Sequence, residues 1–460
     1  MIPMTSEAAA PVVCTLEFLL KNAEGKTQAE GSARGTLQGE TFTLLTDRAE
    51  TIRIVDRDVD AVREEGRVII VRLATGAELT LSKAGRDHET CVRHLTEFCD
   101  RGLIRDLLME EEEIFPMFEA GAAYKKQFRV ESSEFREGAG NSQLGAGGTE
   151  ESSEYGVQSR EGGLSTLNSQ LSTIFPCRLY LFESGLVLFR DGAEPVRIPF
   201  GIVDGVQDEG LNLAVGLDDG ATWTLSALAR SRDPFRNALV TGMDALQTRM
   251  QEALKTAFPG LDPAAIPALS RLFKDGRTVF KDDAESAGPG LWMSLEKAWA
   301  ASEAAVTYST LASKAGGAPI AFGIKHGLWG DLAGDYLFCL IPGLGEMIAW
   351  ETTPLAPKEE SDETEGRATY FFRREAGADW RREVDALARR LLMINFRREP
   401  VYLAQDKLED AAHAQTARAV RHLEPLRNLR KQFAGRAIHT TPEGWTKSVE
   451  TILASRGKEG

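Results

Sequence analysis

The stretch IRIVDRDVDAVREEGRVIIVRLATGAELTLS (residues 52–82) is the most informative part of the sequence, because the chain repeats it as VRIPFGIVDGVQDEGLNLAVGLDDGATWTLS at residues 196–226. The similarity covers residues 33–82 and 177–226 at a constant offset of 144 without a gap, and 20 of the 50 aligned pairs are identical. An ungapped match of this length and density indicates one structural module that is present twice.

Identical and similar positions alternate along the repeat. The apolar residues Ile69, Val71 and Leu73 align with apolar residues 144 positions later, whereas the residues between them differ. A period of two with one apolar face predicts a strand with one buried side. Gly66 recurs as Gly210 after an acidic pair, where a tight turn needs a positive φ. Each copy therefore predicts a meander of hairpins.

An amphipathic helix is expected after each meander. In the second copy Asp233 and Pro234 form a helix start signal, and apolar residues then recur at steps of three and four as far as Leu254. In the first copy the corresponding apolar stripe runs from Cys91 to Leu107. Strands followed by one such helix predict a small β-barrel that is closed by its C-terminal helix.

This order of elements resembles the pleckstrin-homology-like (PH-like) superfold, a seven-stranded antiparallel barrel capped by a C-terminal amphipathic helix. The resemblance covers residues 10–115 and 116–258 and rests on element order. Phosphoinositide-binding members place several basic residues in the first hairpin, where this chain has only Lys21 and Lys26. The resemblance implies a binding module and does not carry over lipid-headgroup binding. Other members bind peptides and proteins, and the fold alone does not choose among ligands.

The remainder of the chain divides by composition. A glycine-, serine- and glutamate-rich piece inside the second module, at about 131–163, predicts a mobile insertion. Residues 259–316 predict a helical connector, and 401–460 predict a helical tail. Strand-like runs followed by an amphipathic helix at 317–400 suggest a diverged third PH-like module. The expected fold class is therefore α+β, with two or three PH-like barrels, a helical connector and a helical tail.

The charge distribution restricts the partners. A formal net charge of -15, from 54 basic and 69 acidic residues, disfavours nonspecific binding to nucleic acid or anionic lipid. The tail is locally basic, because residues 411–440 contain six Arg or Lys residues and one acid, Glu424. Its arginines scatter around the helix axis, whereas a membrane-surface helix segregates charged and apolar residues. We expect a helix packed on the preceding domain, with nucleic-acid or lipid contact as the alternative.

Localisation is predicted from the absence of targeting signals. The chain start shows no basic segment followed by an apolar core, and the five cysteines form no CxxC pair. The longest apolar run, residues 336–350, contains Pro342 and Glu346 and is shorter than the ~20 residues that a spanning helix needs. We therefore expect a cytoplasmic protein with free, buried thiols.

An acidic stretch in the first copy needs separate interpretation. VDRDVD (residues 55–60) places three aspartates at alternate positions, as at the start of a calcium loop. Ala61 and Arg67, however, stand where such a loop needs glycine and a bidentate glutamate. Asp56 and Asp58 also have no acidic counterpart in the second copy. We expect the alternating aspartates on the exposed face of one copy, and no metal.

Two segments provide candidate binding residues. FGIKHGLWGDLAGDY places Lys325, His326 and Trp329 among glycines, which let the backbone approach a ligand closely. In INFRREPVYL, Arg397 and Arg398 leave a helix. Each has a structural alternative. The first could be a long turn whose tryptophan covers the core, and arginine near a helix C-terminus is favoured by the helix dipole alone.

These observations favour a non-enzymatic scaffold whose partner is another protein, bound through grooves or exposed strand edges. The alternatives are a peripheral membrane adaptor that uses the basic C-terminal helix, and an enzyme with a site near residues 323–335. No catalytic residue, cofactor, metal or nucleic-acid partner is predicted.

Overall fold

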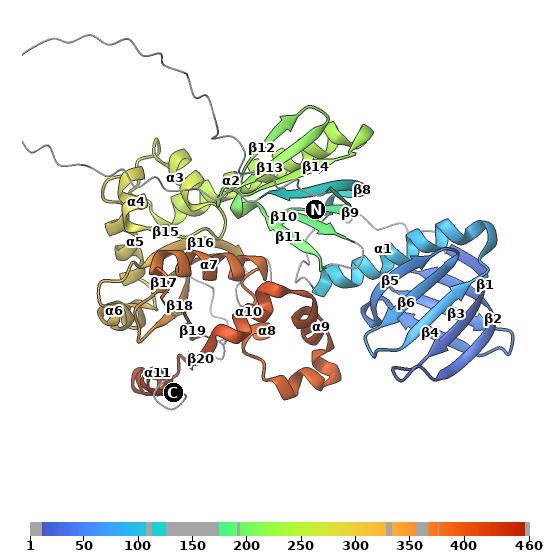
Figure 1. Ribbon diagram of the computed structural model, residues 1–460. Helices are drawn as coiled ribbons and strands as arrows, with labels where there is room; N and C mark the ends of the chain where they lie inside the picture. Colours follow the sequence, from blue (N-terminus) through green and yellow to red (C-terminus); the bar gives the residue numbers. More distant parts are fainter. Residues whose placement is uncertain are drawn as a thin grey trace, which may run out of the picture.

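Three antiparallel β-sheets and the helices packed on them form the structure, which is a computed structural model. It describes residues 12–106, 113–125, 174–190, 194–327, 334–355, 367–375 and 377–455. In Figure 1 the blue first module stands at one end, the green second module lies beside it, and the yellow-to-red remainder contacts the second module. The predicted insertion at about 131–163 lies outside the described residues.

Module 1 consists of seven strands and one helix. They are β1 (Val12–Lys21), β2 (Thr27–Gln38), β3 (Thr41–Thr46), β4 (Thr51–Val55), β5 (Val59–Glu65), β6 (Val68–Leu73), β7 (Glu78–Ser82) and α1 (His88–Asp106). The strands pair in the order β4-β3-β2-β1-β7-β6-β5. A 3₁₀ turn, η1 (Asp56–Asp58), separates β4 from β5. The predicted stripe of α1 is buried at Leu95, Phe98 and Cys99.

Module 2 repeats this arrangement. Its elements are β8 (Glu113–Lys125), β9 (Phe175–Phe182), β10 (Gly185–Phe189), β11 (Val196–Pro199), β12 (Val203–Glu209), β13 (Asn212–Leu217), β14 (Thr222–Ser226) and α2 (Arg232–Ala257). The strands pair in the equivalent order, β11-β10-β9-β8-β14-β13-β12. The 3₁₀ turn η3 (Phe200–Ile202) takes the place of η1. From η1 to α1, each element begins 144 residues before its counterpart, as the sequence repeat requires.

The predicted barrels are not closed. Among the described residues, β4 and β5 are the unpaired end strands of the first sheet, and β11 and β12 are those of the second. A 3₁₀ turn lies between the two end strands in each module, and α1 packs against both η1 and β5. The helix therefore covers the apolar core at the gap where strand pairing would otherwise close the sheet. The modules are open antiparallel sheets, each followed by one covering helix.

The third sheet differs from the other two. Its strands are β15 (Val279–Phe280), β16 (Ala321–Gly327), β17 (Gly334–Ile341), β18 (Met347–Pro354), β19 (Ala368–Arg373) and β20 (Phe433–Ile438). They pair in simple chain order from β15 to β20. Two of these strands come from ranges that we expected to be helical, because β15 lies in the connector and β20 in the tail. Neither strand was predicted, because β15 has only two residues and β20 (FAGRAI) directly follows α10 and shows no clear alternation of apolar and polar residues.

Helices cover both faces of the third sheet. They are α3 (Ile266–Phe273), α4 (Lys281–Ala287), α5 (Leu291–Ala300), α6 (Ala305–Lys314), α7 (Trp380–Met393), α8 (Glu399–Tyr402), α9 (Ala414–His422), α10 (Glu424–Gln432) and α11 (Pro442–Ala454). Along β17, Phe338 and Leu340 join the core that contains α7, whereas Leu337, Cys339 and Ile341 join the core that contains α5, α6 and α11. Burial on both faces explains the continuous apolar run of this strand.

Candidate functional site

Modules 1 and 2 share one feature at the start of the strand that follows the 3₁₀ turn. The pair Val59–Asp60 in module 1 is identical to Val203–Asp204 in module 2. In both modules the strand register skips the aspartate, which marks a β-bulge at the same position. A bulge leaves one residue outside the ladder and redirects its side chain. We call each such pair, with its valine carbonyl and aspartate carboxylate, a Val–Asp corner.

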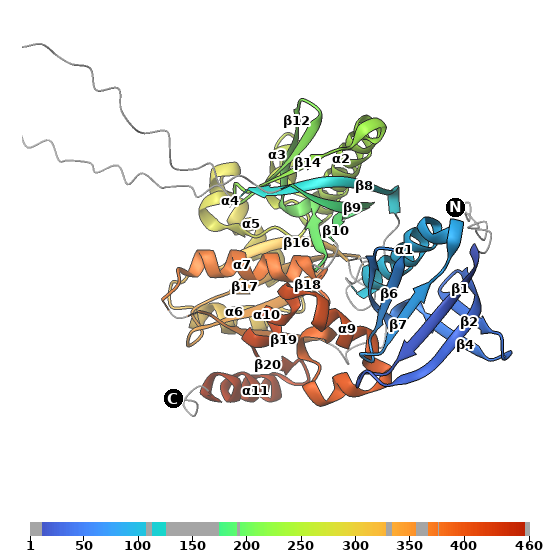
Figure 2. The same ribbon diagram turned by 45° about the vertical axis from the view of Figure 1, so that its right-hand side comes forward.

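In module 1 the corner receives basic side chains from the tail. Arg418 of α9 is 2% exposed and donates to the carbonyls of Asp56 (3.2 Å) and Val59. Arg421 Nη2 lies 3.3 Å, and His422 Nε2 3.4 Å, from Asp60 Oδ1. The tail helix therefore packs on the first module, where it lies beside α1 in Figure 2, and not only on the domain that precedes it.

These contacts alter the acidity of the corner. Burial alone would raise the pKa of Asp60, but the hydrogen bond with His422 and the charges of Arg421 and Arg418 hold it below its usual value. The neighbouring Asp56 is 3% exposed and is paired with Arg105. Our expectation that the alternating aspartates are exposed is therefore wrong for Asp56. Its carboxylate is buried beside α1, where the positive charge of Arg105 offsets the cost of removing it from water.

In module 2 the corner receives a lysine from the connector. Lys274 Nζ donates to the carbonyl of Val203 at 2.9 Å and to Asp204 Oδ1 at 2.6 Å. The two corners thus bind basic side chains from different, distant segments of the same chain. This shared role gives a physical reason why the Val–Asp pair is identical in both copies.

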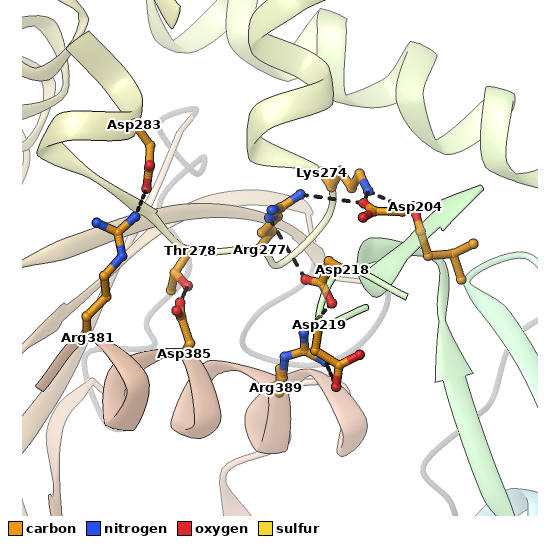
Figure 3. Close-up of polar contacts among 11 residues, drawn as sticks. Asp204, Asp218, Asp219, Lys274, Arg277, Thr278, Asp283, Arg381, Asp385 and Arg389 are labelled. Carbon is orange, nitrogen blue, oxygen red and sulfur yellow. Dashed lines mark hydrogen bonds and ion pairs between the residues drawn. The ribbon is translucent and has the colours of Figure 1, made fainter. Parts of the chain in front are cut away.

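A charged cleft lies where module 2, the connector and α7 meet (Figure 3). We call it the seam cleft, and its volume is about 220 Å³. Helix α7 contributes Arg381, Asp385 and Arg389, which are four residues apart and therefore share one helix face. The connector supplies Arg277 and Thr278, with Asp283 of α4, and module 2 supplies Asp218.

The arginines of the seam cleft are paired within the cleft. Arg381 Nη2 lies 2.5 Å from Asp283, and Arg389 is paired with Asp218. Arg277 lies 3.9 Å from Asp218 and from Asp204 of the corner. Charges that neutralise one another leave little net attraction for a charged ligand. The contacts instead join the three parts of the chain, so we interpret the cleft as a structural seam.

Two carboxyl groups of the seam cleft have a raised pKa. Burial raises the pKa of Asp385, while the hydrogen bond from Thr278 at 2.8 Å and the charge of Arg381 partly oppose the increase. Burial also raises the pKa of Asp218, against the opposing charge of Arg389. Such shifts are typical of catalytic carboxylates and also of structural ion-pair networks. No sequence pattern beyond the spacing on α7 indicates this cleft, because its residues come from separate segments.

A larger groove runs along the end strand of module 1. It lies between β5 and α1, is bordered by β8 of module 2, and has a volume of about 620 Å³. We call it the β5–α1 groove. Half-buried apolar side chains form its floor, and charged side chains form its rim. The floor contains Val62, Val92 and Met117, and the rim contains Arg63, Glu65, Glu89 and Arg93.

Module 2 differs at the equivalent position. There Arg232 and Arg236 of α2 lie 2.5 and 3.2 Å from Asp208 of β12, so that two arginines bridge helix and strand. At the matching positions of module 1, His88 Nε2 lies 2.8 Å from Glu64, and Val92 replaces the second arginine. One of the two bridges is therefore missing in module 1, where the groove lies.

The predicted residues Lys325 and His326 lie together in a buried network. Lys325 is 2% exposed, and its Nζ donates to Asp275 Oδ2 at 2.6 Å and to the His326 carbonyl at 2.7 Å. The His326 amide donates to the other oxygen of Asp275 at 2.7 Å, and its ring lies 2.8 Å from Asp335. This arrangement fixes the connector to β16. Trp329 lies outside the described residues.

The predicted arginines lie elsewhere, between α7 and α8. Arg398 is 9% exposed, donates to Thr352 Oγ1 at 3.0 Å and stands 5.7 Å from the ring centres of Trp350 and Tyr370. Its guanidinium thus packs over an aromatic pair, a contact that stabilises the positive charge. Arg397 precedes it and is half-buried. The structure therefore places the two predicted segments in separate networks.

Comparison with known proteins supplies no relative, because no protein-family model and no curated protein matches the chain. Within the described ranges, no group of three or more His, Cys, Asp or Glu side chains is arranged to hold a metal ion. No helix in that part of the chain combines the length and apolar character needed to cross a membrane.

Proposed function

We propose that the protein is a non-enzymatic scaffold built from tandem PH-like modules, and that module 1 binds an extended segment of a partner protein. The strand order shared by modules 1 and 2, with one helix after each, matches the element order of the superfold and supports the PH-like assignment. The third sheet has a sequential strand order and is not part of the assignment.

The proposal rests on the outer edge of β5, which lies beside the β5–α1 groove. β5 is an end strand of its sheet, and an end strand presents backbone donors and acceptors to an incoming chain. An extended peptide can add to such an edge, where the main chain supplies affinity and side-chain pockets supply specificity. The apolar floor at Val62, Val92 and Met117 provides the pocket for alternate side chains of that peptide.

The membrane alternative receives less support. A lipid-binding tail needs its basic side chains on an outer surface. Arg418 instead donates to module 1 carbonyls, Arg421 contacts Asp60, and Arg427 Nη2 lies 2.7 Å from Glu194 of module 2. These three arginines hold α9 and α10 against modules 1 and 2, which are not the preceding domain on which we expected the tail to pack.

Site-specific photo-crosslinking tests the proposed function. A photoreactive amino acid is placed at position 96, which lies in the groove. As a control, the same photoreactive amino acid replaces Val240, which is the matching position of α2. We expect Thr96 to capture a specific partner segment that Val240 does not. The substitution Val92→Arg should abolish this capture by adding the second bridge to Glu64, whereas Val92→Ile should retain it. Equal capture at both positions would contradict the proposal.

A further inference from the structure

A further groove lies in the tail. Unlike the seam cleft, whose charges are paired within the cleft, this groove has a basic rim. It lies between α8, α9, α10 and the start of β20, and its volume is about 440 Å³. We call it the tail groove. Its apolar wall consists of Val401, Leu403, Val420 and Phe433, and its basic rim consists of Arg427, Arg430 and Lys431. An apolar wall next to a basic rim is suited to a ligand that is both acidic and apolar.

Among the described residues, no carboxylate forms an ion pair with Arg430. Its guanidinium donates to the Pro400 carbonyl at 2.7 Å and contacts Gln405 Oε1 at 3.4 Å, both of which are uncharged acceptors. Burial lowers the pKa of Arg430, as expected for a half-buried cation without an opposite charge nearby. The exposed Lys431 follows directly. Among the described residues neither of these two cations forms an ion pair.

A third cation and an aromatic ring extend this site. The guanidinium carbon of Arg436 lies 3.8 Å from the ring centre of Tyr402, and Tyr402 itself lines the groove. Arg427, in contrast, is held by both oxygens of Glu194, at 2.7 and 2.9 Å, and marks the neutralised end of the rim. The chain as a whole carries a formal charge of -15, so these cations form a local exception.

We propose that the tail groove binds a short acidic segment of a partner protein that also carries an apolar side chain. Carboxylates of that segment would pair with Arg430, Lys431 and Arg436, and the apolar side chain would lie against Leu403 and Phe433. Opposite charges across an interface provide specificity and raise the association rate. A concave site with an apolar wall accepts a peptide side chain, whereas a bilayer surface requires a flat or convex basic face. This proposal does not depend on the β5–α1 groove.

Fluorescence anisotropy on the full chain tests the proposal. The probe is a labelled twelve-residue peptide of aspartate, glutamate and leucine, and a peptide with lysine in place of the acids is its control. We expect saturable binding of the acidic peptide that weakens as salt concentration rises. Lys431→Glu should weaken binding at least tenfold. Lys447→Glu makes the same charge change on an exposed position of α11 and should change binding by less than twofold.

Three results would overturn this assignment. The first is an absence of saturable peptide binding, and the second is an equal loss of binding in the Lys431→Glu and Lys447→Glu proteins. The third is cosedimentation with phosphatidylserine vesicles that Lys431→Glu abolishes while the peptide does not bind, which would assign the groove to a lipid surface instead. Val92→Arg should leave peptide binding at the tail groove unchanged, so the two proposals can fail separately.

Discussion

Replacing Arg418 by methionine should detach the tail helix α9 from module 1. The methionine retains most of the aliphatic stem but removes the donors to the Asp56 and Val59 carbonyls. A hydrogen bond to a charged donor contributes about 1.5–3 kcal/mol, so the loss of two such bonds should cost about 3 kcal/mol or more. The free energy needed to open α9 locally should fall by that amount.

Native-state hydrogen exchange measures this change directly, because it reports local opening of individual segments. A loss of about 3 kcal/mol corresponds to roughly a hundredfold faster exchange of the α9 amides, at 1.4 kcal/mol for each factor of ten. The control is Arg421→Met. Arg421 is half-exposed and lies 3.3 Å from Asp60 of the Val–Asp corner, so its loss should cost only about 0–1 kcal/mol. Equal exchange rates for α9 in the two variants would refute the role assigned to the Val–Asp corner.

Three further predictions concern stability, which urea unfolding measures. Asp385→Asn should stabilise the protein at neutral pH. The folded-state pKa of Asp385 lies above its unfolded value, so the wild-type protein loses stability as pH rises through the folded pKa, and the asparagine variant does not. The gain should disappear below about pH 4, and an equal effect at both pH values would contradict this assignment. Lys325→Met should destabilise the protein by about 3–5 kcal/mol because it leaves Asp275 buried without its cation, yet it should not change capture at Thr96. Gly66→Ala and Gly210→Ala should each cost about 1 kcal/mol because both residues have a positive φ, 66° and 62°, without steric contact; a cost at only one site would argue against equivalent turns.

The local pattern of the sequence predicted much of the two modules. Alternation at Ile69, Val71 and Leu73 gave strand β6, and the offset of 144 placed its counterpart β13. The positive φ expected at Gly66 and Gly210 is present in both turns. Barrel closure was not predicted correctly, because the pattern within a strand does not specify whether the end strands pair.

The long-range contacts could not be predicted from the sequence. The Val–Asp pair is identical in the two copies, but Arg418 and Lys274 are far from it in the chain and follow no periodic pattern. Lys325 was selected because it lies among glycines, whereas its burial depends on Asp275, fifty residues earlier. The tail groove likewise depends on which tail arginines pair with carboxylates of modules 1 and 2. A helical wheel shows only that these arginines are scattered around the helix axis.

In the proposed function, the outer edge of β5 receives a partner segment. Hydrogen exchange with and without the peptide captured at Thr96 tests this placement, because an added strand protects backbone amides at the edge that it joins. We predict slower exchange for residues 61–65 of β5, because Arg418 already occupies the edge at Val59, and no change for the matching residues 205–209 of β12. Protection of both strands to the same degree, or of neither, would contradict the proposed function.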